Sequence, residues 1–227
     1  MRFPVAVKAA AFDLDGTLLD TLPDIAEAAQ RMLTDLGQPA TATENVRCYI
    51  GGGLPRLTKR LLTGQMDGEP PAAEFERALD LFKRHYRATL TQHTRAFPGV
   101  EEGLRLFARS GLKLACVTNK AESFTLPLLA ATGLRGFFDL VVAGDTLPSQ
   151  KPDPLPLLYC AQQFGAQPCE LLVIGDSAND VLAARAAGCP AFCVPYGYSA
   201  GDVRELDCDA IVTDLVEAAR LITPIRS

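Results

Sequence analysis

Apolar and polar positions follow two different patterns along this chain. Between residues 20 and 93, apolar side chains recur at helical spacing, and no run has the continuous apolar character of a buried strand. From Pro98 onward, short continuous apolar runs alternate with segments of helical periodicity. Such alternation is typical of a parallel sheet that is covered by helices on both faces.

The continuous runs predict the strands of this sheet. They lie at residues 8–13, 112–118, 140–144, 171–176, 191–196 and 210–213, and the helices between them lie ahead of residue 112 and at 122–132, 154–164, 180–187 and 215–221. We expect a kink or a late start at Pro127, inside one of these helices. The pattern predicts an α/β fold: a Rossmann-like parallel sheet core with helices on both faces at residues 1–19 and 94–227, and an inserted α-helical cap at 20–93.

Helix start signals support the inserted cap. Asp20 or Thr21 is placed to cap a first helix, with Pro23 in its first turn. Thr41 and Glu44 have the spacing of a capping box ahead of a second helix. Glycines interrupt the chain after that helix, and two further helical segments follow, near residues 55–62 and 75–90.

Polar residues follow several predicted strands of the core. Asp13 ends the first strand, Thr118-Asn119 the second and Asp176 the fourth, and Lys151 lies in the loop after the third. In open α/β sheets, functional groups gather at the carboxyl ends of the strands. We therefore expect these four loops to converge on one crevice.

The segment from Asp13 to Thr17 carries a candidate reaction centre. Asp13 and Asp15 point to the same side of an extended chain and would repel one another unless a cation lies between them. One carboxylate is suited to attack phosphorus and the other to transfer a proton. Gly16 permits a turn and exposes amide groups to an anion. A plain Asp-Gly turn capped by Thr17 is the structural alternative.

Two further motifs fit the same chemistry. Asp176 ends an apolar strand, and carboxylate oxygens there suit Mg²⁺, whereas Asp180 begins the next helix, where acidic residues also serve as simple caps. Lys151 lies in a loop restricted by two prolines, Pro152 and Pro154, which would hold its ammonium toward a crevice or leave it in solvent.

Composition narrows the class of protein. The 227 residues are 48% hydrophobic and 22% charged, with a net charge of -5, which predicts a globular protein without a basic nucleic-acid face. Seven cysteines without a Cys-x-x-Cys pair, and two histidines, argue against zinc and for free thiols. The chain shows neither a signal peptide pattern nor an apolar run long enough for a bilayer, so we expect a cytoplasmic enzyme without a membrane partner.

In their order along the chain, the four motifs resemble those of the haloacid dehalogenase superfamily. Within it, the sequence is most similar to phosphoglycolate phosphatases, with which it also shares the string from Tyr49 to Gly53, although Gly52 stands where those relatives often have Asn. The resemblance implies a Mg²⁺-dependent phosphomonoester hydrolase that forms an aspartyl-phosphate. The substrate it implies first is 2-phosphoglycolate, which would be hydrolysed to glycolate and phosphate. The partner would be a small phosphorylated metabolite, and either a monomer or a homodimer is consistent with the sequence.

The resemblance also assigns roles to individual residues. Asp13 would be the nucleophile, and Asp15 the general acid and then base. Mg²⁺ would be held by Asp13, by Asp176 and by the main-chain carbonyl of Asp15. Thr17 and Asp180 would support these ligands, Asp180 by ordering the metal's waters or Lys151. The predicted substrate-binding residues are Gly16, Thr118, Asn119, Lys151, Gly52, Gly53 and Arg56.

The sequence leaves several functions open. A sugar phosphate or pyrophosphate phosphatase, or a phosphosugar mutase of the same superfamily, would carry the same motifs, and a non-catalytic phosphate-sensing domain is a remote alternative. A dehalogenase is disfavoured because it has no use for the acid Asp15. The core motifs address only phosphate, so we expect the cap loop at Gly51–Gly53 to choose the substrate through a helix N-terminus that favours a carboxylate.

Overall fold

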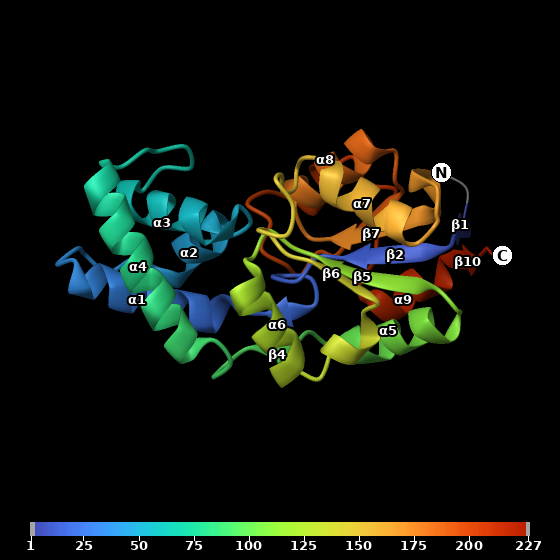
Figure 1. The fold of residues 1–227 in the computed structure, drawn as a ribbon, viewed down its shortest axis with the longest axis horizontal. Helices are drawn as coiled ribbons and strands as arrows, with labels where there is room; N and C mark the ends of the chain where they lie inside the picture. The colour runs from blue at the N-terminus through green and yellow to red at the C-terminus, as the bar shows by residue number, and fades with distance from the viewer. Residues whose placement is uncertain (1–2, 226–227) are drawn as a thin grey trace.

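A computed structural model describes residues 3–225, so residues 1–2 and 226–227 of the predicted core lie outside the described part. An α/β unit and a group of helices lie side by side along the long axis of the molecule (Figure 1). The strands are β1 Val5–Val7, β2 Ala9–Phe12, β3 Leu19–Asp20, β4 Arg95–Ala96, β5 Lys113–Val117, β6 Leu140–Val142, β7 Leu171–Gly175, β8 Ala191–Cys193, β9 Ala210–Ile211 and β10 Ile222–Pro224. The α-helices are α1 Leu22–Asp35, α2 Thr43–Tyr49, α3 Gly53–Thr63, α4 Ala72–Thr89, α5 Val100–Arg109, α6 Glu122–Ala131, α7 Leu155–Gln163, α8 Ala178–Ala187 and α9 Leu215–Arg220, with 3-10 turns at Arg135–Phe137, Pro168–Glu170 and Val203–Glu205.

Six parallel strands form the main sheet, in the order β6-β5-β2-β7-β8-β9. The chain runs outward from β2 in both directions, through β5 on one side and β7 on the other. This change of direction puts the switch point of the sheet at the carboxyl end of β2, where Asp13 follows. The structure thus confirms the predicted α/β sheet with a helical insertion.

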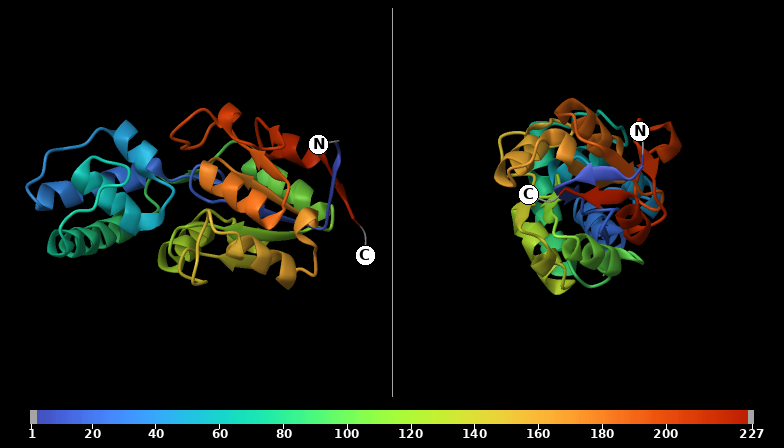
Figure 2. Two further views of the ribbon diagram at one scale, coloured as in Figure 1. Left: turned by 90° about the horizontal axis from the view of Figure 1, so that it is seen from above. Right: turned by 90° about the vertical axis from the view of Figure 1, so that its right-hand side faces the viewer.

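Both faces of the central strands β2, β5, β7 and β8 are buried, which explains the continuous apolar runs in the sequence. On one face Phe12 packs in a cluster with Phe107 of α5, and on the other Ala11 packs with Leu157 of α7. Figures 1 and 2 show α7 and α8 on one side of the sheet and α5 and α9 on the other. Because neither face meets water, these strands carry no polar alternation.

The four cap helices are joined to the core by two adjacent chain crossings. The strands β3 and β4 pair antiparallel, so the chain enters and leaves the cap at one place. Asp24, fully buried in α1, accepts hydrogen bonds from the backbone N–H groups of His93 and Thr94, at 2.9 and 2.8 Å, and from the Thr94 hydroxyl at 2.7 Å. This carboxylate therefore ties the two crossings together.

Some local predictions differ from the structure. The helix α2 begins at Thr43, with Ala42 as its N-cap and no hydrogen bond from a capping side chain. The prediction of a capping box formed by Thr41 and Glu44 is therefore wrong. The helix α6 begins at Glu122 and continues through Pro127, so the prediction that this helix starts late, at the proline, is also wrong. The short strands β1, β3, β4 and β10 were not predicted, because two- or three-residue pairings depend on their distant partners.

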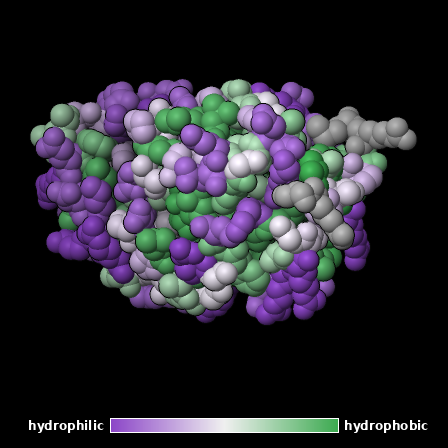
Figure 3. Space-filling model, turned by 45° about the vertical axis from the view of Figure 1, so that its right-hand side comes forward, coloured by the Kyte–Doolittle hydropathy of each residue, from purple (hydrophilic) through white to green (hydrophobic). Residues whose placement is uncertain are grey.

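The surface shows no extended apolar face in the view of Figure 3, where hydrophobic residues are interspersed with hydrophilic ones. The large hydrophobic side chains that are exposed lie far apart along the sequence or in different helices and strands: Phe3, Met66, Leu158, Leu182 and Ile211. Within residues 3–225, none of the helices combines the length and the apolar character needed to cross a membrane.

Candidate active site

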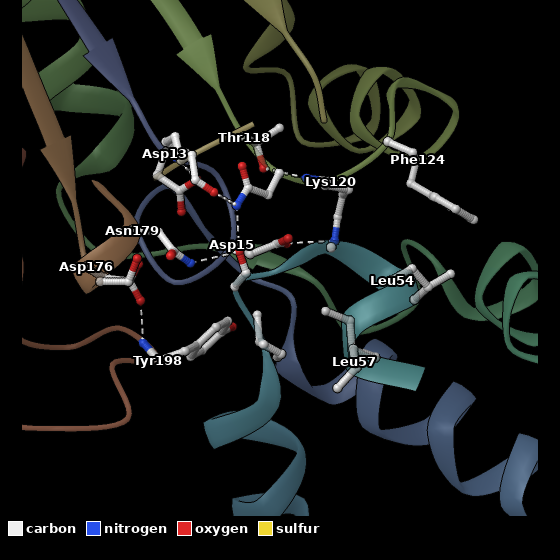
Figure 4. Close-up of a pocket in the computed structure, with 18 of the residues that line it drawn as sticks. Asp13, Asp15, Leu54, Leu57, Thr118, Lys120, Phe124, Asp176, Asn179 and Tyr198 are labelled. Atoms are coloured by element: carbon white, nitrogen blue, oxygen red, sulfur yellow. Dashed lines mark hydrogen bonds and ion pairs between the residues drawn. The ribbon is translucent and has the colours of Figure 1, made fainter. Parts of the chain in front are cut away.

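A pocket lies between the carboxyl ends of the central strands and the cap helices (Figure 4). The core supplies its polar wall, and the cap supplies an apolar wall that includes Leu54 and Leu57 of α3. The predicted site residues that line it are Asp13, Asp15, Gly53, Thr118, Asn119, Lys151, Asp176 and Asp180. The four strand-end loops therefore do meet in one crevice.

Lys151 is held at the centre of the polar wall. Its Nζ donates to Asp13 Oδ1 at 2.7 Å, to Asp180 Oδ1 at 2.6 Å and to the carbonyl of Val117 at 2.7 Å. These two carboxylates raise the pKa of Lys151 against the opposing effect of burial, so its charge is retained. The other oxygen of Asp180 accepts from the Ser177 hydroxyl at 2.7 Å, which fixes Asp180 as a support for Lys151.

Asp176 lacks such a cation. It is 2% exposed, and within residues 3–225 no lysine, arginine or histidine forms an ion pair with it. Burial, with the charges of Asp13 and Asp180, raises its pKa well above the ordinary value. Its carboxylate is oriented by the backbone N–H of Tyr198 and, at 3.5 Å, by the Thr17 hydroxyl.

The acidic cluster fits a metal ion. Ligand oxygens of Asp13, Asp176 and Asp180 lie within 4.8 Å of one another. Buried carboxylates this close together repel one another unless positive charge lies beside them. Lys151 neutralises part of that charge, and a hard dication held by carboxylate oxygens would neutralise the rest.

Asp15 faces the pocket from the turn after β2. Its Oδ1 accepts from the Thr21 hydroxyl at 2.6 Å and lies 2.8 Å from Lys120 Nζ. Among the described residues, neither a hydrogen bond nor an ion pair engages Asp15 Oδ2. That oxygen is therefore free to exchange a proton with a ligand in the pocket.

Gly16 acts differently from the sequence-based expectation. Its N–H donates to the carbonyl of Leu19 at 2.9 Å, so it is not exposed to an anion, and Gly16 does not line the pocket. Its φ is +88°, and a Cβ there would lie 2.3 Å from Asp176 Oδ2. The glycine is required because the turn passes directly against the Asp176 carboxylate.

Asn119 connects the core to the cap loop. Its side-chain amide donates to the carbonyls of Gly51 and Lys151, both at 2.8 Å. Asn179 of α8 donates to the same Gly51 carbonyl at 3.1 Å. Two core amides thus hold the cap loop over the polar wall.

Two predicted cap residues do not reach the pocket. The Arg56 guanidinium pairs with the exposed side chains of Asp67 and Glu69, and Arg56 does not line the pocket. Gly52 is the N-cap of α3 and lies outside the lining, whereas Gly53 lies within it. The positive charge of Arg56 is therefore neutralised within the cap.

Several lining residues were missed by the sequence-based prediction. Tyr86 belongs to the apolar stripe of α4, so its hydroxyl gave no signal, and Tyr198 follows β8 by several residues. Lys120 directly follows Thr118-Asn119, and that position was the available signal. In addition, residues from the N-cap or first turn of α3, α6 and α8, among them Gly53, Ala121 and Ser177, line the pocket, so three helix N-termini favour an anion there.

The chain matches the family described as haloacid dehalogenase-like hydrolase over residues 10–194, a span that contains Asp13, Asp15, Thr118, Lys151, Asp176 and Asp180. The protein belongs to this family of hydrolases.

Its relatives narrow the comparison further. The chain is 55% identical over 222 residues to a protein of Thiobacillus denitrificans named phosphoglycolate phosphatase, covering 97% of this chain and 98% of that one. It is 56% identical to one of the same name from Nitrosospira multiformis, with 98% of each covered. A crystal structure from Haemophilus somnus, described as a predicted phosphoglycolate phosphatase, has a TM-score of 0.88 at 34% identity and covers 93% of this chain and 96% of that one.

Proposed function

We propose that this protein hydrolyses 2-phosphoglycolate to glycolate and phosphate through a phosphorylated Asp13. The observation that carries the proposal is the convergence of Asp13, Asp15, Lys151 and Asp176 in one pocket of a chain whose close relatives bear the phosphoglycolate phosphatase name. We expect the reaction to take place in the cytoplasm, which stays a prediction from the sequence.

In the first half-reaction, an Asp13 carboxylate oxygen forms a bond to phosphorus while the bond from phosphorus to the glycolate oxygen breaks. Asp15 gives its proton to that departing oxygen. Thr118, whose hydroxyl lines the pocket, donates to a phosphoryl oxygen, and Lys151 offsets the charge that gathers between nucleophile and phosphate. An anionic nucleophile otherwise repels an anionic ester.

In the second half-reaction, water attacks the phosphorus of the aspartyl-phosphate. Asp15, now a carboxylate, takes the proton of that water, and the bond to Asp13 breaks to release phosphate. The single engaged oxygen of Asp15 holds the side chain in place, while Oδ2 carries the proton in both directions.

The proposed cofactor is Mg²⁺. Asp13, Asp176 and the main-chain carbonyl of Asp15 would hold it, supported by Asp180 and Thr17. Bound there, Mg²⁺ supplies positive charge to the phosphoryl oxygens and to the nucleophile. The spacing of the carboxylates supports this assignment, as does the burial of Asp176 without an ion pair to any of residues 3–225.

Phosphate release from a panel of esters tests the proposal. The panel contains 2-phosphoglycolate, a hexose phosphate, pyrophosphate and an aryl phosphate, each assayed with Mg²⁺ and with excess chelator. We expect 2-phosphoglycolate to have the highest kcat/KM and chelation to abolish release. A preferred hexose phosphate, or an isomerised sugar phosphate in place of free phosphate, would contradict it.

Thermal stability should depend jointly on pH and Mg²⁺. Burial raises the pKa of Asp13 from its ordinary 3.8 to about 7. The folded protein therefore binds this proton more tightly than the unfolded chain, and the stabilisation is lost as the pH rises from about 4 to about 7. Because Mg²⁺ binds the deprotonated carboxylates, the rise in Tm on adding Mg²⁺ should be small near pH 5 and large near pH 8, on the order of several degrees.

Melting curves at both pH values, with Mg²⁺ or chelator, measure this effect. The Asp176→Asn variant is the control, since it removes a proposed ligand and should flatten the response at both pH values. An equal Mg²⁺ shift at the two pH values would argue against a site that competes with protons.

The close approach of Gly53 to the core predicts a cap-docking defect in Gly53→Ala. Gly53 has φ +75°, and a Cβ there would lie 2.9 Å from the carbonyl oxygen of Asn119. Gly64, at the end of α3, has φ +66° with open space around it, so Gly64→Ala carries similar backbone strain without the clash. Both variants should lose about 1 kcal/mol of stability.

Only Gly53→Ala should also lower kcat/KM for 2-phosphoglycolate, on the order of tenfold or more, because the cap no longer closes on the pocket. Parallel kinetics and melts of the two variants measure this. Equal kinetic losses would mean that cap stability, and not docking, is what the glycine provides.

A further inference from the structure

Lys120 is a buried lysine at the pocket for which the mechanism above has no role. It lies in the loop after β5 and is 7% exposed. Its Nζ lies 2.8 Å from Asp15 Oδ1 and donates to the Tyr86 hydroxyl at 2.9 Å, so it reaches from the core to helix α4 of the cap. Figure 4 shows this ammonium directed at the Asp15 carboxylate, and Leu54 and Leu57 line the same pocket.

The surroundings keep Lys120 charged. Burial disfavours the ammonium, but Asp15 outweighs that cost, so the pKa of Lys120 is raised. Tyr86 stays neutral because burial raises its pKa to about 12. The centre of its ring lies 4.9 Å from Lys120 Nζ, which gives the ammonium a favourable cation–π contact. An ammonium has three N–H donors, and the described residues accept from it at Asp15 and Tyr86. One donor is left for a ligand.

The position of this donor along the substrate follows from Asp15. In the proposed mechanism Asp15 protonates the oxygen leaving phosphorus, so the atoms beyond that oxygen would lie within reach of the groups around Asp15, which include Lys120 at 2.8 Å. In 2-phosphoglycolate a single methylene group separates this oxygen from the carboxylate. A carboxylate so close to the leaving oxygen falls beside Lys120 when phosphate sits at Asp13 and Lys151.

The described residues offer no second free cation at this end of the pocket. The three donors of Lys151 already have acceptors, and Arg56 is paired with Asp67 and Glu69 and does not line the pocket. The cap side of the lining, where Lys120 contacts Tyr86, is largely apolar and includes Ile25, Ile50 and Leu57. Apart from the helix N-termini, an anionic leaving group against this wall would have no charged partner other than Lys120.

We propose that Lys120 determines specificity by binding the carboxylate of the leaving group, with the Tyr86 hydroxyl holding the ammonium in place. This inference rests on the proposed function and adds to it the residue that distinguishes glycolate from a neutral alcohol. It assigns to Lys120 the role that the sequence alone suggested for the Gly51–Gly53 loop and Arg56.

The test compares 2-phosphoglycolate with its amide analogue, in which a neutral carboxamide replaces the carboxylate. The wild type should prefer the carboxylate substrate. In Lys120→Met, kcat/KM should fall for both substrates, because Asp15 loses a partner, but the preference for the carboxylate should fall by a further 10- to 100-fold or so, as expected for one charge-assisted hydrogen bond. Most of this extra loss should appear in KM.

Two more variants separate charge from packing. Lys120→Gln retains a donor without charge and should lose the preference as Lys120→Met does, which keeps the test informative if the methionine variant fails to fold. Lys120→Arg retains the charge and should keep most of the preference. Thermal melts of each variant establish that it is folded.

The outcomes distinguish this inference from the function on which it rests. An unchanged carboxylate preference in folded Lys120→Met and Lys120→Gln would overturn the role of Lys120 and leave phosphoglycolate hydrolysis in place. A wild-type protein that does not prefer the carboxylate substrate would contradict the proposed function, and the inference with it.

Discussion

Asp13→Asn should abolish turnover of 2-phosphoglycolate, with a loss of more than about 10⁴-fold, because a carboxamide oxygen is a poor nucleophile toward phosphorus. The substitution preserves the shape of the side chain and the contact with Lys151, 2.7 Å away. Burial raises the pKa of the Asp13 carboxyl to about 7. At pH 8 the variant therefore puts a neutral amide in place of a buried carboxylate, and folding should not suffer.

Acid quenching of wild-type turnover, followed by mass spectrometry of peptides, should find one phosphoryl group on Asp13. A matched control is Asp153→Asn in the adjacent loop, where the carboxylate accepts from the backbone N–H of Leu155 at 2.8 Å and does not line the pocket. This control should retain near wild-type activity. Normal turnover in Asp13→Asn, or phosphate on another residue, would rule out the covalent route.

Asp15→Asn should lower kcat by about 10²- to 10⁴-fold, the usual contribution of one acid–base group. The asparagine carbonyl can still accept from Thr21, at 2.6 Å in the wild type, so the turn after β2 keeps its geometry. What the variant loses is the proton at Oδ2, which both half-reactions require.

The two half-reactions can be separated with an aryl phosphate. A nitrophenolate leaves without a proton, so Asp15→Asn should form the aspartyl-phosphate at a moderately reduced rate and then hydrolyse it slowly. Stopped-flow absorbance should show a burst of nitrophenolate followed by a slow steady state, with phosphoenzyme accumulating. If the variant shows no burst and equal losses with aryl and glycolyl substrates, Asp15 has a structural role in place of the catalytic one.

The sequence predicted the core because its strands are buried on both faces. Each continuous apolar run, such as the one that ends at Asp13, can be satisfied only inside a sheet covered by helices, and the predicted strands of the main sheet all lie in it. The same runs end in polar residues at one edge, which is why the order of residues alone was enough to place Asp13, Thr118 and Asp176 together.

The sequence could not assign the contacts that cross from core to cap. Arg56 and Lys120 are both basic residues beside a predicted site motif, and nothing local distinguishes them. The structure pairs Arg56 with Asp67 and Glu69 within the cap and places Lys120 between Asp15 and Tyr86. Likewise, the lack of space for a Cβ at Gly16 arises from the carboxylate of Asp176, which is remote in sequence.

The sequence by itself therefore determined the sheet, the inserted helices and the strand-end residues, because hydrophobic periodicity and turn chemistry act over a few neighbouring residues. The tertiary structure decided which charges meet: Lys151 with Asp13 and Asp180, and Lys120 with Asp15. Coulombic and hydrogen-bond partners depend on distances between side chains from different elements, and burial sets how strongly they interact. Those distances exist only once the strand-end loops have come together at the carboxyl edge of the sheet, and the contact of Lys120 with Tyr86 also requires the cap.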